Sequence, residues 1–199
     1  MNIFASKRGK SALHTQYAAE ADFCRIFEKD MNRLYLLSLL LTADSEWAEK
    51  CFVAGLEDSK NSNPVFKEWA QSWARRTIIM NAIRMLAPRP ERTLARARSS
   101  HVGKLNDLPA DLAAVGELSA FERFVFVMSV LEGYSDRECS LLLNCSGADV
   151  VIGRTRALQQ LASVGARQKL ANIRDSQSQG GDSEVALAQE MIPRMAATA

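Results

Sequence analysis

Residues 118–161 read LSAFERFVFVMSVLEGYSDRECSLLLNCSGADVVIGRTRALQQL. Three pairs in this stretch have the spacing of a helix N-terminal capping box: Ser119 with Glu122, Ser135 with Glu138, and Ser146 with Asp149. Gly133 and Asn144 follow two of the expected helices, and both residue types tolerate the left-handed backbone of a helix end. The stretch therefore predicts three helices, and the tight turn between the last two is typical of a helix-turn-helix.

The residues upstream of this stretch also follow a helical pattern. Apolar residues recur at helical spacing between Phe23 and Leu41, and Asp44 is positioned to cap a further helix. Residues 57–64, EDSKNSNP, have the composition of a loop. A longer helix is expected over 65–86, where it ends before two prolines. Its apolar stripe is formed by Phe66, Trp69, Trp73 and Met80.

These patterns together predict an all-α protein with two small helical domains. The first domain is expected at 16–88 and the second, with the helix-turn-helix, at 109–172. A basic linker at 89–108 joins them. A flexible N-terminal arm is expected at 1–15 and a flexible tail at 173–199, which contains QSQGGDS.

The charge of the chain is unevenly distributed. The 199 residues carry a formal net charge of only +2. Residues 61–110, however, hold 9 Lys or Arg against 3 Asp or Glu, a local charge of +6. Residues 111–199 carry a net charge of −3. If the chain binds nucleic acid, the basic block should provide most of the attraction for phosphate.

The sequence gives little support for a metal site, a cofactor, a membrane span or an enzyme. The four cysteines include no CxxC pair, and His14 and His101 are the only histidines, so no zinc site is expected. No apolar run reaches the ~20 residues of a membrane span, and the N-terminus lacks the apolar core of a signal peptide. We therefore expect a cytoplasmic protein without a cofactor, a membrane partner or a small-molecule substrate. A catalytic function is not expected, because no convergent set of acid, base, nucleophile and metal ligands is visible.

The two halves of the chain resemble two regions of one protein family. Residues 118–161 resemble region 4 of bacterial RNA polymerase sigma factors of the extracytoplasmic-function type, group four of the sigma-seventy family. The matching residues include Arg123, Phe126, Leu131, Gly133 and Ser135, then Glu138, Leu142, Leu143, Ser146, Val150, Arg156, Ala157, Leu158 and Leu161. The segments RLYLLSLLLTADSEWAEKCF and FKEWAQSWARRTIIMNAIR resemble region 2 of the same family. Their order and the basic linker between them are the most specific features.

The resemblance implies a transcription-initiation function and a set of binding residues. A sigma factor binds core RNA polymerase and promoter DNA, and some members also bind an anti-sigma protein. The resemblance places DNA contacts at Trp69, Trp73, Arg75, Arg76, Arg84, Ser146, Arg156, Gln159 and Gln160. It places polymerase contacts at Trp47, Glu49 and Phe52. Region 2 is expected to act at the −10 promoter element and region 4 at the −35 element.

Several positions differ from the family pattern. Lys50 stands where an acidic residue is usual, and Val53 stands near the usual Gln. On a helical projection, the apolar face of the last helix contains Val150, Val151, Leu158 and Leu161. The opposite face contains Asp149, Ile152, Gly153, Arg156, Gln159 and Gln160, of which one is basic. Because this face has a single basic residue, we expect weak recognition of the −35 element.

Other interpretations of the same residues remain open. Trp69 and Trp73 are either stacking platforms for melted DNA or part of the core, and the arginines are either phosphate contacts or solvated surface. Trp47 and Phe52 could equally pack within the first domain. As a whole, the chain could be a degenerate sigma-like interaction module that binds polymerase or a regulator without promoter recognition. It could also be another helix-turn-helix regulator with a sensor domain.

Overall fold

A computed structural model describes residues 16–90 and 110–190. Within these ranges every regular element is a helix, which confirms the all-α prediction, and the one extended contact is an isolated bridge between Tyr17 and Phe66. The described helices include none that is long and apolar enough to cross a membrane. The chain divides into one compact unit that ends at Leu158 and a second that begins at Gln159. The predicted arm at 1–15 and most of the linker at 89–108 lie outside the described residues.

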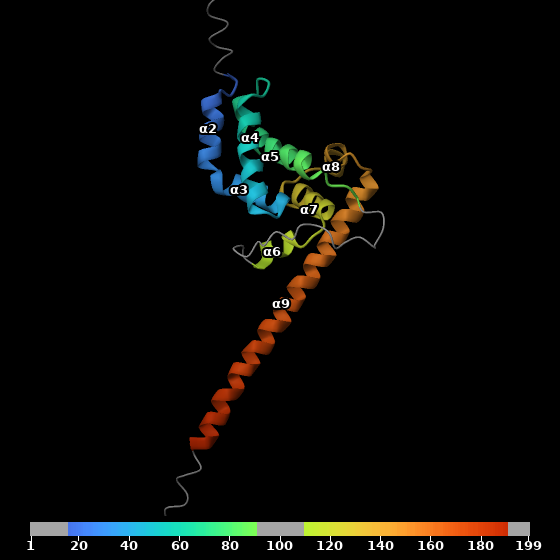
Figure 1. Cartoon of the computed structure of the whole chain (residues 1–199). Helices are drawn as coiled ribbons and strands as arrows, with labels where there is room; N and C mark the ends of the chain where they lie inside the picture. The colour runs from blue at the N-terminus through green and yellow to red at the C-terminus, as the bar shows by residue number, and fades with distance from the viewer. Residues whose placement is uncertain (1–15, 91–109, 191–199) are drawn as a thin grey trace, which may run out of the picture. The chain divides into compact units, whose positions relative to one another are not determined.

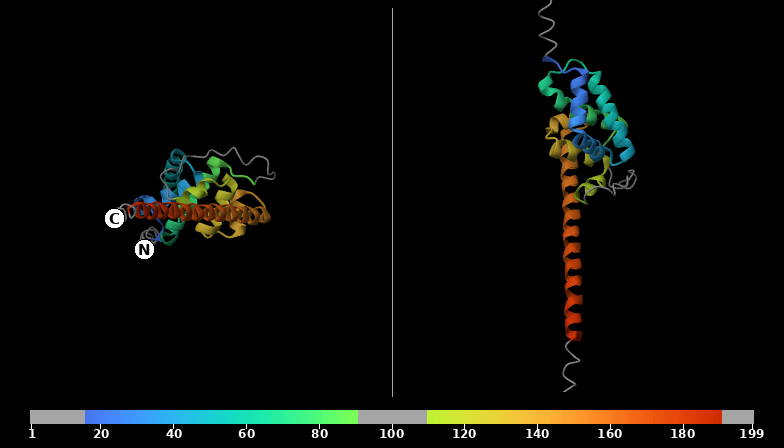
Figure 2. Two further views of the ribbon diagram at one scale, coloured as in Figure 1. Left: turned by 90° about the horizontal axis from the view of Figure 1, so that it is seen from below. Right: turned by 90° about the vertical axis from the view of Figure 1, so that its left-hand side faces the viewer.

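The first four long helices form a bundle, shown in blue to green in Figure 1. They are α2 (Glu20–Lys29), α3 (Met31–Thr42), α4 (Ser45–Lys60) and α5 (Ala70–Leu86), and a short 3-10 turn, η1 (Lys67–Trp69), precedes α5. Asp44 caps α4 by accepting from the Trp47 backbone N–H at 2.9 Å, as the sequence predicts. Pro88 follows the end of α5, where Ala87 adopts left-handed backbone with φ of 42°. Figure 2 shows the bundle from two other directions.

Close packing between α4 and α5 depends on a glycine and on paired hydroxyls. A Cβ atom added to Gly55 would lie 2.7 Å from Ile78 Cγ1, so α4 can approach α5 at this point only without a side chain. One helical turn further along α4, the buried hydroxyls of Ser59 and Thr77 lie 2.8 Å apart. Both hydroxyls also bond to carbonyls of their own helices, so these buried polar groups are satisfied.

The second half of the chain contains the predicted helix-turn-helix. Its elements are α6 (Ala110–Gly116), α7 (Ala120–Phe126), the π-helical segment η2 (Val127–Leu131), α8 (Asp136–Leu143) and α9 (Gly147–Glu190). Ser119, Ser135 and Ser146 accept from the backbone N–H three residues on, and for the last two the acidic side chain bonds back, as predicted. Gly133 and Asn144 have φ of 73° and 50°, which confirms the two predicted left-handed positions.

Arg123 connects the helix-turn-helix half to the bundle. Its side chain is 3% exposed, and its Nε donates to the Leu41 carbonyl at 3.0 Å. The two terminal nitrogens donate to the carbonyls of Thr42 at 3.5 Å, Leu118 at 3.1 Å and Gly116 at 3.4 Å. Three of these carbonyls lie in the last turns of α3 and α6, where helical backbone lacks its own partners. Burial lowers the pKa of Arg123 to about 10, so the guanidinium remains charged at neutral pH.

The fold departs from the sequence prediction in three places. The helix expected over 65–86 begins later, because α5 starts at Ala70 after the 3-10 turn η1, and Phe66 forms a bridge with Tyr17. Residues 57–60, predicted as loop, complete the last turn of α4, because the Asn61 N–H continues the helical bonding to the Glu57 carbonyl. Residues 173–190, predicted as flexible tail, belong to α9. The first proline after α9 begins is Pro193, so no residue before it lacks the backbone N–H that a helix requires. The division into two domains at 89–108 remains a prediction.

Candidate nucleic-acid interface

The arginines of α5 that were predicted to contact DNA all lie beside acidic or phenolic groups. Arg84 is exposed, and its Nη1 lies 2.7 Å from Asp58 of α4. Arg75 is half-buried, and its Nη1 lies 3.7 Å from Glu132 Oε2. Arg76, also half-buried, lies beside Tyr134 and Glu138, and its charge acts to lower the pKa of both groups. The structure thus gathers three predicted residues on α5 but gives each a partner within the chain.

A groove of about 370 Å³ runs between α5 and the start of α8. Its walls are formed by Pro64, Val65, Phe66, Trp69, Ser72, Trp73, Arg76, Tyr134 and Glu138. Phe66 packs edge-on against Trp69, with ring centroids 5.2 Å apart, and stacks on Tyr17 at 4.8 Å. Aromatic side chains can stack on the planar bases of a single-stranded nucleic acid, and an arginine can bind its negatively charged phosphates. The groove is therefore suited to such a strand.

The two tryptophans of the groove are not the core stripe that helical spacing suggests. Trp69 is 57% exposed and Trp73 is half-buried. The buried face of α5 instead consists of small and β-branched residues: Ala70, Ala74, Thr77, Ile78, Ile79, Asn81 and Ala82. These residues fit the close approach of α4 at Gly55, which leaves no room for indole rings. Within the described residues, the Trp73 indole N–H is buried and has no hydrogen-bond partner.

The first turns of α9 are rotated relative to the predicted apolar face. Val150 and Ala157 are fully buried and Gly153 is buried between them, whereas Val151 is 44% and Leu158 46% exposed. A Cβ atom on Gly153 would lie 2.9 Å from Phe121 Cε1, so this glycine seats α9 on α7 and does not face solvent. Arg154 forms an ion pair with Asp136 of α8.

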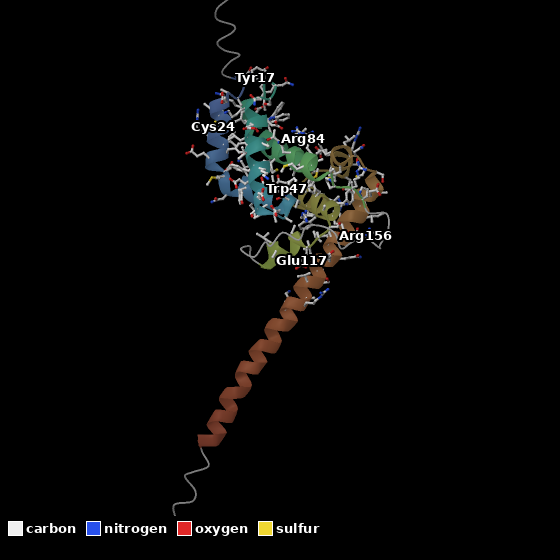
Figure 3. All side chains as sticks on the ribbon, viewed as in Figure 1. Tyr17, Cys24, Trp47, Arg84, Glu117 and Arg156 are labelled. Atoms are coloured by element: carbon white, nitrogen blue, oxygen red, sulfur yellow. The ribbon has the colours of Figure 1, made fainter. Side chains whose placement is uncertain are left out.

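The solvent face of α9 is therefore mostly apolar. Within 147–158, the exposed residues are Gly147, Ala148, Val151, Ile152, Thr155, Arg156 and Leu158, of which one is charged. Ser146, a predicted DNA contact, caps α9: its hydroxyl donates to Asp149 Oδ2 at 2.7 Å. Arg156 and Gln159 are exposed, and Gln160 is half-buried. The side chains labelled in Figure 3 include Arg156 on α9 and Arg84 on α5.

The predicted polymerase contacts on α4 differ in exposure. Trp47 is 38% exposed, and the Lys50 ammonium lies 5.9 Å from the centre of its ring. Glu49 is exposed, whereas Phe52 is half-buried between Phe27 at 5.3 Å and Tyr35 at 6.3 Å. Phe52 therefore packs within the bundle, which was the alternative interpretation. Lys50, the residue that departs from the family pattern, forms an ion pair with Glu46 at 2.6 Å.

Sequence reasoning did not identify the groups that face α5 from the second half. Burial raises the pKa of Tyr134, and the neighbouring Arg76 partly offsets this effect. The Ser135 hydroxyl and backbone N–H, with a smaller contribution from Arg76, lower the pKa of Glu138. No periodic signal marks these residues, because they lie around the turn between η2 and α8. The one available signal was the three acids Glu132, Asp136 and Glu138 within seven residues, in a chain whose basic block lies elsewhere.

The part of the chain that the structure describes contains no cluster of three or more His, Cys, Asp or Glu that could hold a metal ion. Comparisons of the chain with protein-family models, with curated proteins and with solved structures find no match. The functional argument therefore depends on the residues of this chain alone.

Proposed function

We propose that this protein is a sigma factor of the extracytoplasmic-function type, in which α2–α5 act on polymerase and the −10 element and the α8–α9 pair acts near the −35 element. The observation that carries the proposal is the groove in which the rings of Trp69 and Trp73 lie beside Arg76. Trp69 is exposed in η1, and the half-buried Arg75 and Arg76 lie one to two turns further on, in α5. Stacking and phosphate contacts together are the usual means of holding a single strand.

The helix-turn-helix half provides independent support. The helices α8 and α9 are joined by the three residues Asn144, Cys145 and Ser146. Asn144 in left-handed backbone provides the sharp turn, and the ion pair between Arg154 and Asp136 holds the two helices together. This arrangement matches a helix-turn-helix that presents its second helix to a duplex.

A second candidate function is favoured by the apolar face of α9. Val151 and Ile152 are 44% and 48% exposed in the turns that would enter the major groove. Apolar side chains there contact thymine methyl groups at best and provide no attraction for phosphate. A sigma-like interaction module, which binds polymerase or a regulator without reading a promoter, would present such a face to a protein.

The test is reconstitution of the full chain with bacterial core RNA polymerase. Binding is measured by co-elution, and initiation is measured by run-off transcription from a genomic promoter library. The sigma proposal expects specific initiation that is lost with Arg75→Glu plus Arg76→Glu. The matched control, Arg167→Glu plus Lys169→Glu, makes the same change of charge on exposed positions of α9 beyond its first turns and should retain initiation.

The other outcomes separate the two candidate functions. Co-elution with polymerase without initiation at any promoter supports the interaction module. A chain that neither binds core polymerase nor supports initiation excludes the sigma assignment. Equal loss of initiation in the Arg167 and Lys169 control would mean that net charge matters and the α5 surface does not.

A further inference from the structure

Two carboxylates from one short segment lie against the arginines of α5. Glu132 follows η2 and lies 3.7 Å from Arg75, with its side chain 17% exposed. Glu138, in the first turn of α8, lines the aromatic groove together with Arg76. Between them in the sequence, Tyr134 lines the same groove beside Arg76. Acidic and phenolic groups thus follow the arginines along one face of α5.

The spacing of these groups has a chemical meaning if α5 binds nucleic acid. A carboxylate and a phosphate oxygen make the same charge-assisted bonds to guanidinium. A phenol ring can occupy an aromatic groove in the way that a base does. The segment 132–138 therefore presents two anions and one ring to the residues that would hold two phosphates and one base.

From this geometry we infer that segment 132–138 acts as an internal mimic of a nucleic-acid strand, which covers the α5 surface and must be displaced when DNA binds. The inference rests on the proposed function, because it concerns the regulation of the same surface. It also assigns a new role to Glu132, Tyr134 and Glu138, which compete with DNA for the α5 surface.

The local structure allows displacement without unfolding the bundle. Arg123, which holds the second half to α3, lies on α7, before the segment begins. Gly133 has φ of 73° and nothing within 4 Å of an added Cβ, so the chain can bend there without a side-chain clash. Displacement breaks two backbone bonds, from the Glu132 and Tyr134 N–H groups to the Val127 and Met128 carbonyls. The π-helical η2 ends immediately before the segment, and such insertions often mark functional sites.

The test measures the affinity of the full chain for a short fluorescein-labelled single-stranded DNA by fluorescence anisotropy. Glu132→Gln plus Glu138→Gln removes both charges, and the new amide oxygen at the second position would still accept the capping bond from the Ser135 N–H. We expect this variant to bind the DNA roughly 3- to 10-fold more tightly than the wild type, because Arg75 loses its ion-pair partner and Arg76 loses a neighbouring negative charge, both of which compete with phosphate. The control Glu28→Gln plus Glu46→Gln makes the same charge change on exposed positions of α2 and α4 and should match the wild type.

Each outcome has a defined meaning. Binding that is unchanged, or increased equally in the control, overturns the mimic and leaves the proposed function standing. Absence of binding by every protein overturns the mimic, whereas the reconstitution with core polymerase decides the proposed function separately. If the double variant proves unfolded by circular dichroism, Glu132→Gln alone decides the matter, because Glu132 makes no cap and should still tighten binding. A merely structural role for these acids would lower the melting temperature without raising the affinity for DNA.

Discussion

The helix α5 and the first turns of α9 both carry residues that the sequence assigns to DNA, yet their solvent faces differ in chemistry. On α5 and the preceding η1 the face combines the exposed Trp69 and the half-buried Trp73 with arginines, and the arginines already have anionic or phenolic neighbours. On α9 the face is apolar, and within 147–158 Arg156 is its one exposed charge. The difference indicates that attraction for nucleic acid is concentrated in the first half of the chain, whereas α9 is better suited to an apolar partner surface.

The largest expected effect concerns Arg123, whose hydrogen bonds connect the helix-turn-helix half to the bundle. Arg123→Met keeps much of the side-chain volume but leaves four buried carbonyls without their donor. We expect a loss of about 3 kcal/mol in the free energy of unfolding, since each unsatisfied buried acceptor costs about 1–3 kcal/mol and nearby groups relax. Urea denaturation followed by circular dichroism measures this loss. A change below about 0.5 kcal/mol, as at ordinary surface positions, would show that the link is unimportant.

A second experiment compares how tightly each helix is seated. Gly55→Ala should cost about 2 kcal/mol, because the new methyl group meets Ile78, including its backbone. Gly153→Ala should cost less, about 1 kcal/mol, because the Phe121 ring edge can shift. Gly165→Ala is the control: nothing lies within 4 Å, so it should stabilise α9 by up to about 1 kcal/mol. A neutral Gly55→Ala variant would contradict the packing of α4 on α5.

The third prediction compares the two faces directly. Arg75→Gln plus Arg76→Gln should weaken binding of single-stranded DNA about 20-fold near 0.1 M salt, the effect of losing two phosphate contacts. Arg156→Gln should weaken it about threefold or less. Fluorescence anisotropy over a salt series gives both values. If Arg156 proved the more important residue, the assignment of the main contact to α5 would be wrong.

The smallest expected effect concerns the apolar face of α9. Val151→Lys replaces an exposed side chain, so the stability should change by less than about 0.5 kcal/mol. The added charge should raise affinity for duplex DNA about threefold at low salt if α9 approaches a phosphate backbone. No gain, together with weaker co-elution with polymerase, would instead indicate that this face meets a protein.

Local signals in the sequence predicted the helix ends well, but tertiary contacts decided which faces are buried. The serine caps, Gly133, Asn144 and the stop at Pro88 are properties of a few neighbouring residues, and each lies where the sequence placed it. The Trp69–Trp73 stripe was ambiguous, because periodicity identifies a face without saying whether protein covers it. Gly153 was placed towards solvent because a glycine has no hydropathy that reveals a close contact with Phe121.

The residues that meet α5 from the second half were beyond sequence reasoning for a related reason. Their partners lie more than fifty positions away in the chain, and no residue pattern specifies that pairing. In the sequence, Arg123 is visible only as a charged residue within the largely apolar segment FERFVF. The carbonyls that accept its hydrogen bonds lie mainly at the ends of two other helices, and no residue pattern indicates that pairing.

The unpartnered indole N–H of Trp73 has a practical consequence for studying this protein. Two of its three tryptophans, Trp69 and Trp73, line the groove, and the third, Trp47, lies on α4. Indole emission responds to the polarity and hydrogen bonding around the ring. Any molecule that enters the groove, or any movement of Tyr134 away from it, should change the colour of the intrinsic fluorescence. The chain therefore carries a built-in optical reporter at the surface whose occupancy is in question.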